Sequence, residues 1–213
     1  NGLLTGESVD KIARRLKGRL RFGERASVKQ LAQKGGEVTA VANNQVMALV
    51  RTSVNQVANA ASQRTYEANQ EVTQRYRYVA TLDGKTSAIC RALDGRVFEY
   101  GKGPTPPQHF NCRSTTVPII NYEALGIEPP PEGRRKATEG TVPGNLTYGQ
   151  WLSRQSKADQ TKILGNSPRR AAYFRKLSNK IGPTEAMRRF VREDGSEVTL
   201  DYLRENYGNV RTQ

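Results

Sequence analysis

The chain has 213 residues, of which 36% are hydrophobic, and it carries a formal net charge of +14. This length suits one sizeable core, or one domain with an appended module. No apolar run approaches the roughly 20 residues of a membrane span, and two cysteines do not make a disulfide framework, so we expect a soluble protein of a reducing compartment without a membrane partner.

The positive charge is concentrated at the two ends of the chain. Residues 1–35 contain nine Lys or Arg and three acidic residues, residues 36–133 contain nine of each, and residues 134–213 contain sixteen and eight. A neutral centre between two basic flanks predicts that the flanks contact a polyanion or an acidic protein surface. The alternative is that the charge only keeps the protein in solution.

Residues 1–36 are interpreted as a basic amphipathic arm. Ser8 can cap a short helix with apolar residues at helical spacing, namely Val9, Ile12, Leu16 and Leu20. Such a narrow apolar stripe is typical of a docking face rather than of the core of a free domain.

Residues 37–122 are predicted to form the core. A stretch without Gly or Pro, from residue 37 to about residue 68, has apolar residues at helical spacing and predicts a long helix. Alternation over residues 75–82 predicts a strand, a helical turn carries Cys90, Asp94-Gly95 predicts a two-residue hairpin, and residues 113–117 predict a returning strand. We therefore expect an α+β fold in which long N-terminal helices pack on a small antiparallel sheet or hairpin.

The remaining residues divide into a linker and a helical module. Residues 123–146 are rich in Pro, Gly and charge, which predicts a linker that buries no apolar area. Residues 147–213 predict a basic, mostly helical C-terminal module that opens with a capping box from Thr147 to Gln150. Further helices are expected at residues 157–164, 168–177 and 184–191, with a last short one over residues 198–204.

Both cysteines and the only histidine of the chain lie between residues 78 and 118. Cys90, His109 and Cys112 are residue types that bind zinc, and Asp83 is the nearest acceptable fourth ligand by sequence, with water as the alternative. Other interpretations remain open: Cys90 as a small buried hydrophobic residue with His109 as a hydrogen-bonded turn residue, a Cys90–Cys112 disulfide, or a hydrolase in which His109 activates one of the cysteines.

Basic residues on several predicted helices and in the linker are candidates for sequence-independent contact with phosphates, because no base-reading motif accompanies them. These candidates are Arg14, Arg15, Lys17, Arg19, Arg134, Arg135, Lys136, Arg169, Arg170, Arg175, Lys176, Arg188, Arg189 and Arg192. A solvated basic face is the alternative for each of them.

The stretch Y-V-A-T-L-D-G-K-T-S-A-I-C-R-A-L-D-G-R-V-F, followed by P-P-Q-H-F-N-C-R-S, resembles the phage Mu F-like minor head protein family. The family pattern has an aromatic strand, D-x-x-T, a Cys or His, L-D-G, and then P-P-x-H-x-x-C-R. The residues that match it are Asp83, Thr86, Cys90, Asp94, Gly95, Pro107, His109, Cys112 and Arg113. Arg51-Thr52 with Asn55 is similar to the helix that precedes the strand in this family. One departure is Ser114, where the family often has a further cysteine.

The resemblance implies a non-enzymatic virion component of a tailed bacteriophage that is present in few copies and acts in head morphogenesis. Such proteins are associated with the portal or the inner capsid surface and with packaged double-stranded DNA, so the implied partners are the portal protein, the major capsid protein and DNA. The implied location is the head interior or portal vertex, after assembly in the host cytoplasm. A zinc-dependent or Cys/His-dependent hydrolase acting in head maturation or DNA delivery is the alternative.

Overall fold

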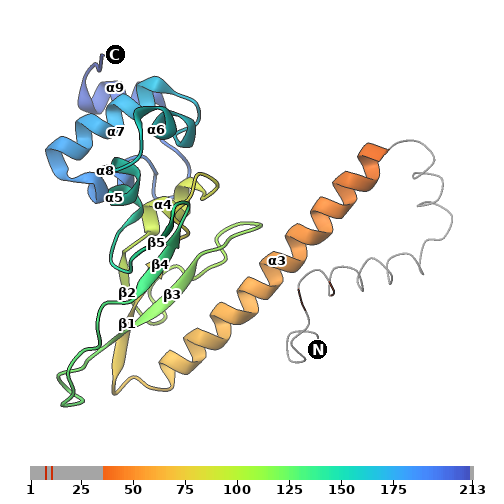
Figure 1. Ribbon diagram of the computed structural model, residues 1–213, viewed down its shortest axis with the longest axis vertical. Coiled ribbons are helices and arrows are strands. Elements are labelled where there is room, and N and C mark those ends of the chain that lie inside the picture. The colour runs from red at the N-terminus through yellow and green to blue at the C-terminus, as the bar shows by residue number, and fades with distance from the viewer. Residues whose placement is uncertain (1–7, 9–10, 12–35, 212–213) are drawn as a thin grey trace.

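The computed structural model describes residue 8, residue 11 and residues 36–211 (Figure 1). A long helix, α3 (Gly36–Glu67), leads into a small sheet, and the C-terminal helices gather at the opposite end of the sheet. The predicted helix of the N-terminal arm lies outside the described residues, apart from its cap, where the Ser8 hydroxyl accepts a hydrogen bond from the Lys11 backbone N–H at 3.3 Å.

Helix α3 contacts the sheet through buried polar side chains. Gln63 donates to the Thr116 hydroxyl at 2.9 Å, and the Tyr66 hydroxyl donates to the Thr116 carbonyl. Asn59 and Gln63 are buried on this face. The Asn and Gln residues that lower the helical propensity of this segment therefore stabilise its packing.

The central sheet has the strand order β2-β1-β3, with β1 (Thr73–Val79) antiparallel to β2 (Val97–Glu99) and to β3 (Thr115–Ile120). Successive side chains along each strand point to opposite faces of the sheet, so one face is buried and the other is partly exposed. Tyr76 and Tyr78 are fully buried on one face, while Arg77 and Val117, which pair across β1 and β3, lie on the other. The strand predicted over residues 75–82 is confirmed, with its start two residues earlier and its end at Val79.

The hairpin predicted at Asp94-Gly95 is wrong. The residues before it form the end of helix α4 (Ala88–Leu93), and the residues after it lead into β2, which pairs with β1. Gly95 does have the positive φ that the turn signal requires, at 77°. Asp94 is not at an exposed turn, because its buried carboxylate accepts hydrogen bonds from the backbone N–H groups of Ala80 and Tyr148, each at 2.7 Å.

The segment predicted as a featureless linker contains a second, two-stranded sheet formed by β4 (Arg134–Ala137) and β5 (Gly140–Pro143). Contrary to the prediction, it buries apolar area, since Ala137 and Val142 pack against the main core and Leu146 is buried. A parallel bridge between Leu82 and Ala137 attaches this hairpin to the segment that follows β1.

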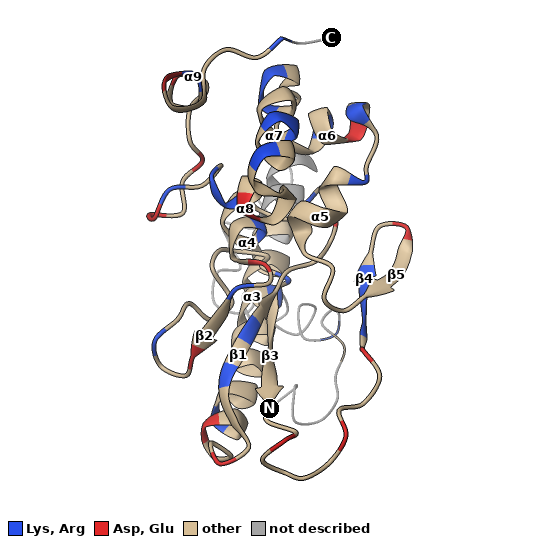
Figure 2. Ribbon diagram, turned by 90° about the vertical axis from the view of Figure 1, so that its left-hand side faces the viewer, with Lys and Arg blue, Asp and Glu red and all other residues tan. Residues whose placement is uncertain are grey.

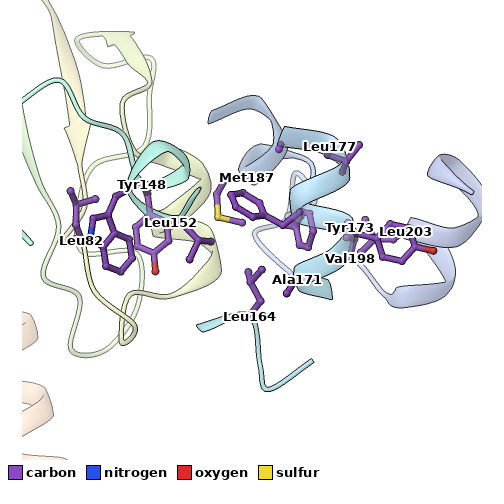
Figure 3. Packing of buried hydrophobic residues seen from close by; sticks show 14 of the residues in the cluster. Leu82, Tyr148, Leu152, Leu164, Ala171, Tyr173, Leu177, Met187, Val198 and Leu203 are labelled. Atoms are coloured by element: carbon purple, nitrogen blue, oxygen red, sulfur yellow. The ribbon is translucent and has the colours of Figure 1, made fainter. Parts of the chain in front are cut away.

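The C-terminal module has the predicted helical organisation. Its helices are α5 (Tyr148–Ser153), α6 (Lys157–Ile163), α7 (Pro168–Ile181), α8 (Pro183–Arg188) and α9 (Leu200–Tyr207). The capping box between Thr147 and Gln150 is confirmed. Figure 3 shows Leu82, from the segment that follows β1, beside Tyr148 and Leu152 in the apolar core of this module.

A buried ion pair joins the hairpin to the sheet. The Arg135 guanidinium contacts Asp94 at 2.7 Å and also donates to the carbonyl oxygens of Ala80 and Leu146. The two side chains are 8% and 0% exposed, so the pair is almost fully removed from water. Helices with two small antiparallel sheets confirm the α+β class, and within the described residues no helix is long and apolar enough to cross a membrane.

Candidate metal centre

Cys90, His109 and Cys112 come together under the sheet. Their potential ligand atoms all lie within 4.8 Å of one another. The Cys90 Sγ lies 3.8 Å from the Cys112 Sγ and 3.4 Å from the His109 Nε2. Both cysteines are free and buried. Among the residues that the structure describes, this group is the cluster that could hold a metal ion.

Three different elements position these ligands. Helix α4 carries Cys90, while His109 and Cys112 lie on the loop before β3, where the Cys112 N–H bonds to the His109 carbonyl. Helix α3 holds this loop from the other side, because Asn55 donates to the Cys112 carbonyl at 2.6 Å and the Thr52 hydroxyl accepts from the Asn111 N–H at 2.9 Å.

The hydrogen bonds of His109 place the lone pair, which a metal would need, on its Nε2 atom. Its Nδ1 lies 2.8 Å from the Phe110 carbonyl oxygen, which can only accept, so Nδ1 carries the proton and Nε2 carries the lone pair. The Ser87 hydroxyl lies 2.7 Å from Nε2. Ser87 is also the N-cap residue of α4, but its side chain makes no cap hydrogen bond, which leaves the hydroxyl free to contact the imidazole.

The electrostatics of the cluster favour one thiolate. The pKa of Cys112 is lowered, chiefly because the Cys90 thiol donates a hydrogen bond to its sulfur; burial opposes this, and backbone hydrogen bonds from Gln108 and Ser114 assist it. The pKa of Cys90 is raised by the same hydrogen bond and by burial. Cys112 is therefore prepared to bind a cation as the thiolate, which is the form that ligates metals.

Asp83 is not brought into this cluster. Its carboxylate oxygens accept hydrogen bonds from the Arg113 guanidinium at 2.5 and 2.8 Å, and one of them also accepts from the Lys85 N–H. Burial raises the pKa of Asp83, but the hydrogen bonds and charge of Arg113 outweigh it and hold this pKa below its ordinary value of 3.8. Asp83 thus fixes the turn after β1.

A small hollow borders the metal cluster and is lined by Ser87, Cys90, His109 and Ser114, among others. Its volume is about 10 Å³, which matches the space for one water molecule. The arrangement can therefore provide three protein ligands and admit a water as the fourth.

The basic residues predicted to bind nucleic acid fall into different environments. Arg14, Arg15, Lys17 and Arg19 lie outside the described residues. Arg135 is buried in the ion pair with Asp94, which removes it from any surface. Arg170 is mostly buried against Glu197 and the Phe190 ring, Arg175 donates to Gln160, and Lys176 donates to the Tyr207 carbonyl. Lys176 is nevertheless exposed and Arg175 half-exposed, and the other exposed or half-exposed candidates are Arg134, Lys136, Arg169, Arg188, Arg189 and Arg192.

The residue types of several side chains around the metal cluster do not by themselves indicate a role in the site. The roles of Thr52 and Asn55 in holding the ligand loop were signalled only by the similarity of their motif, and Arg51, from the same motif, is exposed. The contact of Ser87 with His109 had no signal beyond its helix-capping position. Ser114 is buried and interacts with both cysteine sulfurs, so the position where the family often has a cysteine does face the cluster.

The first half of the chain matches a known protein family. The family model described as Phage Mu protein F like protein matches residues 1–117, which is more than half of the chain. The chain belongs to this family. Membership in the Mu F-like family indicates a phage head morphogenesis protein and hence a component of the virion. Searches of curated proteins and of solved structures gave no significant match.

The matched region of this Mu F-like protein contains helix α3, all three metal-cluster residues and the start of β3. The β4–β5 hairpin and the C-terminal helices lie beyond it.

Proposed function

We propose that the chain is a structural, non-enzymatic minor head protein of a tailed bacteriophage, present in few copies and associated with the portal or the inner capsid surface and with packaged DNA. The observation that carries this proposal is the match of the helix–sheet core to the Mu F-like family. The cluster of Cys90, His109 and Cys112 supports a structural role for that core, as the following geometry indicates.

Zinc fits the donor set and the spacing of the cluster. In a tetrahedral site with Zn–S bonds of about 2.3 Å, two sulfurs lie about 3.8 Å apart, and a sulfur and a nitrogen lie about 3.5 Å apart. The Cys90–Cys112 and Cys90–His109 separations in this protein are 3.8 Å and 3.4 Å, and the third separation, between Cys112 and His109, is at most 4.8 Å. A bound zinc ion would cross-link α4 to the loop before β3 and so stabilise a three-stranded sheet that has little core of its own.

The surroundings of the cluster favour a structural metal over a catalytic one. Cys90 and Cys112 are 1% and 2% exposed, and the adjoining hollow of about 10 Å³ accommodates one water but no substrate. A hydrolase would require an opening at which a substrate could reach the thiolate or the metal-bound water.

The C-terminal module supports the part of the proposal that concerns DNA. Figure 2 shows Lys and Arg along the whole length of α7 and on α6. Arg169 and Lys180 are exposed at the two ends of α7, and Lys157 and Lys162 are exposed on α6. Such a surface suits non-specific contact with phosphates.

Elemental analysis of the purified protein tests the metal. We expect one zinc per chain, its loss in Cys90→Ala and Cys112→Ala, and its retention in Ser87→Ala, since Ser87 touches His109 without being a zinc ligand by type. Absence of zinc from the protein prepared without chelators contradicts this part of the proposal. Hydrolytic activity that disappears in Cys112→Ala while the fold persists would instead favour the hydrolase.

Particle location and DNA retention test the remainder. Antibody labelling or mass spectrometry of intact and DNA-emptied particles should find few copies within the head or at the portal vertex. Retention of duplex DNA by the purified protein should fall steeply as the salt concentration rises. Retention that is absent or independent of salt would refute the DNA contact.

A further inference from the structure

The solvent face of the sheet and the β4–β5 hairpin enclose a groove of about 480 Å³. Val79 and Val117 lie in it from the sheet, with Val117 40% exposed. Arg77, from β1, and Arg134 and Lys136, from β4, supply the positive charge. We call these five residues the basic groove. Pockets of about 300–1,000 Å³ commonly bury most of a drug-sized ligand, which is comparable in size to a few side chains.

The cations of the basic groove are not neutralised within the molecule. Among the described residues no carboxylate forms an ion pair with Arg77, Arg134 or Lys136. Glu132 also borders the groove with one negative charge, and one of its oxygens accepts a hydrogen bond from the Asn145 N–H. Three cations against this one carboxylate leave the groove with an apolar floor and a net positive charge.

The segment between β3 and β4 has the complementary character. Figure 2 shows acidic positions along this segment, which projects from the end of the sheet. We call residues 121–132 the acidic loop. Leu125 and Ile127 are 42% and 55% exposed, and Glu123 and Glu128 are exposed beside them. Exposed aliphatic side chains flanked by carboxylates match a groove that combines valines with Arg and Lys.

The acidic loop is ordered before any partner binds. The backbone N–H of Leu125 bonds to the Asn121 carbonyl, that of Gly126 to Glu123, and that of Ile127 to Tyr122. Three consecutive prolines, residues 129–131, then stiffen the chain. Little conformational entropy remains to be lost when such a loop docks, which favours binding.

We propose that the acidic loop of one copy of this protein docks in the basic groove of a second copy. Leu125 and Ile127 of one copy pack on Val79 and Val117 of the other, and Glu128 faces the cations of β4. Glu132 ends the loop and also lines the groove, so loop and groove are adjacent on one side of the molecule. A two-fold axis can then satisfy both contacts at once and gives a closed dimer.

Charge reversal in the full-length chain tests this contact. Sedimentation velocity at about 0.15 M salt, where the Debye length is about 8 Å, screens the net repulsion between copies but retains close ion pairs. We expect a monomer–dimer equilibrium for the wild type. Glu128→Lys and Lys136→Glu should each weaken dimerisation at least about tenfold. An equimolar mixture of the two variants, and the double variant alone, should restore it, because each contact is then again between opposite charges.

An apolar variant with a matched control completes the test. Ile127→Ser should weaken the dimer, whereas Val57→Ser should not, since Val57 on α3 is equally exposed, at 54%, but lies away from the loop and groove. A wild type that stays monomeric at all accessible concentrations overturns the proposal. So does a dimer that survives Ile127→Ser and both charge reversals, or a Lys136→Glu variant that loses DNA retention without any change in association state.

Discussion

Replacing Arg135 with methionine should be among the most destabilising single substitutions in the described part of the chain. The Asp94 carboxylate is fully buried and accepts two backbone N–H groups and two guanidinium N–H groups. Methionine keeps the aliphatic stem but removes the charge, so Asp94 stays buried without its counterion, and the Ala80 and Leu146 carbonyls lose a donor. Breaking one side of a buried pair costs about 3–5 kcal/mol, and we expect a loss of stability in this range.

Urea unfolding followed by the fluorescence of Trp151 measures this loss. Trp151 is the only tryptophan, is 1% exposed, and its indole N–H donates to the Glu139 carboxylate. Its emission should therefore report the opening of the C-terminal core. Arg134→Met is the matched control on the same strand, because Arg134 is exposed and donates one hydrogen bond, to the Thr141 carbonyl. We expect a change of no more than about 0.5 kcal/mol for this control.

Adding Asp94→Asn separates the charge from the packing. The double variant Asp94→Asn/Arg135→Met no longer buries an unpaired carboxylate, and an amide oxygen can still accept from Ala80 or Tyr148. Its loss of stability should be smaller than the sum of the two single losses by about 0.5–3 kcal/mol. If Arg135→Met lowers the free energy of unfolding no more than Arg134→Met does, or if the two single losses add without coupling, the pair does not join the hairpin to the sheet.

Three further predictions follow from single contacts. Asn55→Ala should lower the melting temperature at constant metal by the equivalent of about 1–3 kcal/mol, because the Cys112 carbonyl loses its donor; exposed Gln56→Ala is the control, and equal effects would contradict a role in holding the loop. Gly149→Ala should destabilise by at least about 1–3 kcal/mol in urea, since its Cβ would lie 2.1 Å from the Pro183 carbonyl oxygen, whereas Gly133→Ala meets nothing within 4 Å. Folding lowers the pKa of Asp83, so the ionised side chain contributes its full stabilisation of the fold above its ordinary pKa of 3.8, and this stabilisation disappears as the pH falls through the lower folded pKa. The wild type should therefore be more stable to urea than Asp83→Asn at pH 6, and this difference should shrink below about pH 4. A difference that does not depend on pH would refute this.

Local patterns were sufficient to predict the elements whose signals lie within a few residues. Helix α3 follows from a stretch without Gly or Pro, and α5 from the capping box at Thr147. The metal cluster could be predicted because the chain has only three Cys or His residues. Their proximity required the fold, since Cys90 and Cys112 are brought together by α4 and the loop that α3 holds.

The errors concern residues whose partners are distant in sequence. Asp94-Gly95 has the composition of a hairpin turn, but Asp94 is held by Arg135, which is 41 residues further on. The linker composition of residues 123–146 concealed a hairpin that contributes only small apolar side chains, Ala137 and Val142, to the core. Arg135 was also wrongly predicted to lie on a DNA-binding surface. A sequence does not distinguish a buried arginine, whose guanidinium is hydrogen-bonded within the protein, from a solvated one.

The same distant contacts bear on where the folding unit of this Mu F-like protein ends. The family match stops at residue 117, and the sequence predicted a core boundary at residue 122. Inside that core, however, Asp94 depends on Arg135, the buried Arg91 guanidinium donates to the Ile163 carbonyl, and the Tyr148 hydroxyl donates to the Asp83 carbonyl. Buried charged and polar groups without partners are costly. The matched core and the C-terminal module therefore stabilise each other and form one folding unit. A metal bound at Cys90 and Cys112 would stabilise the core of this unit, and the hairpin and C-terminal helices supply the partners of the core's buried polar groups.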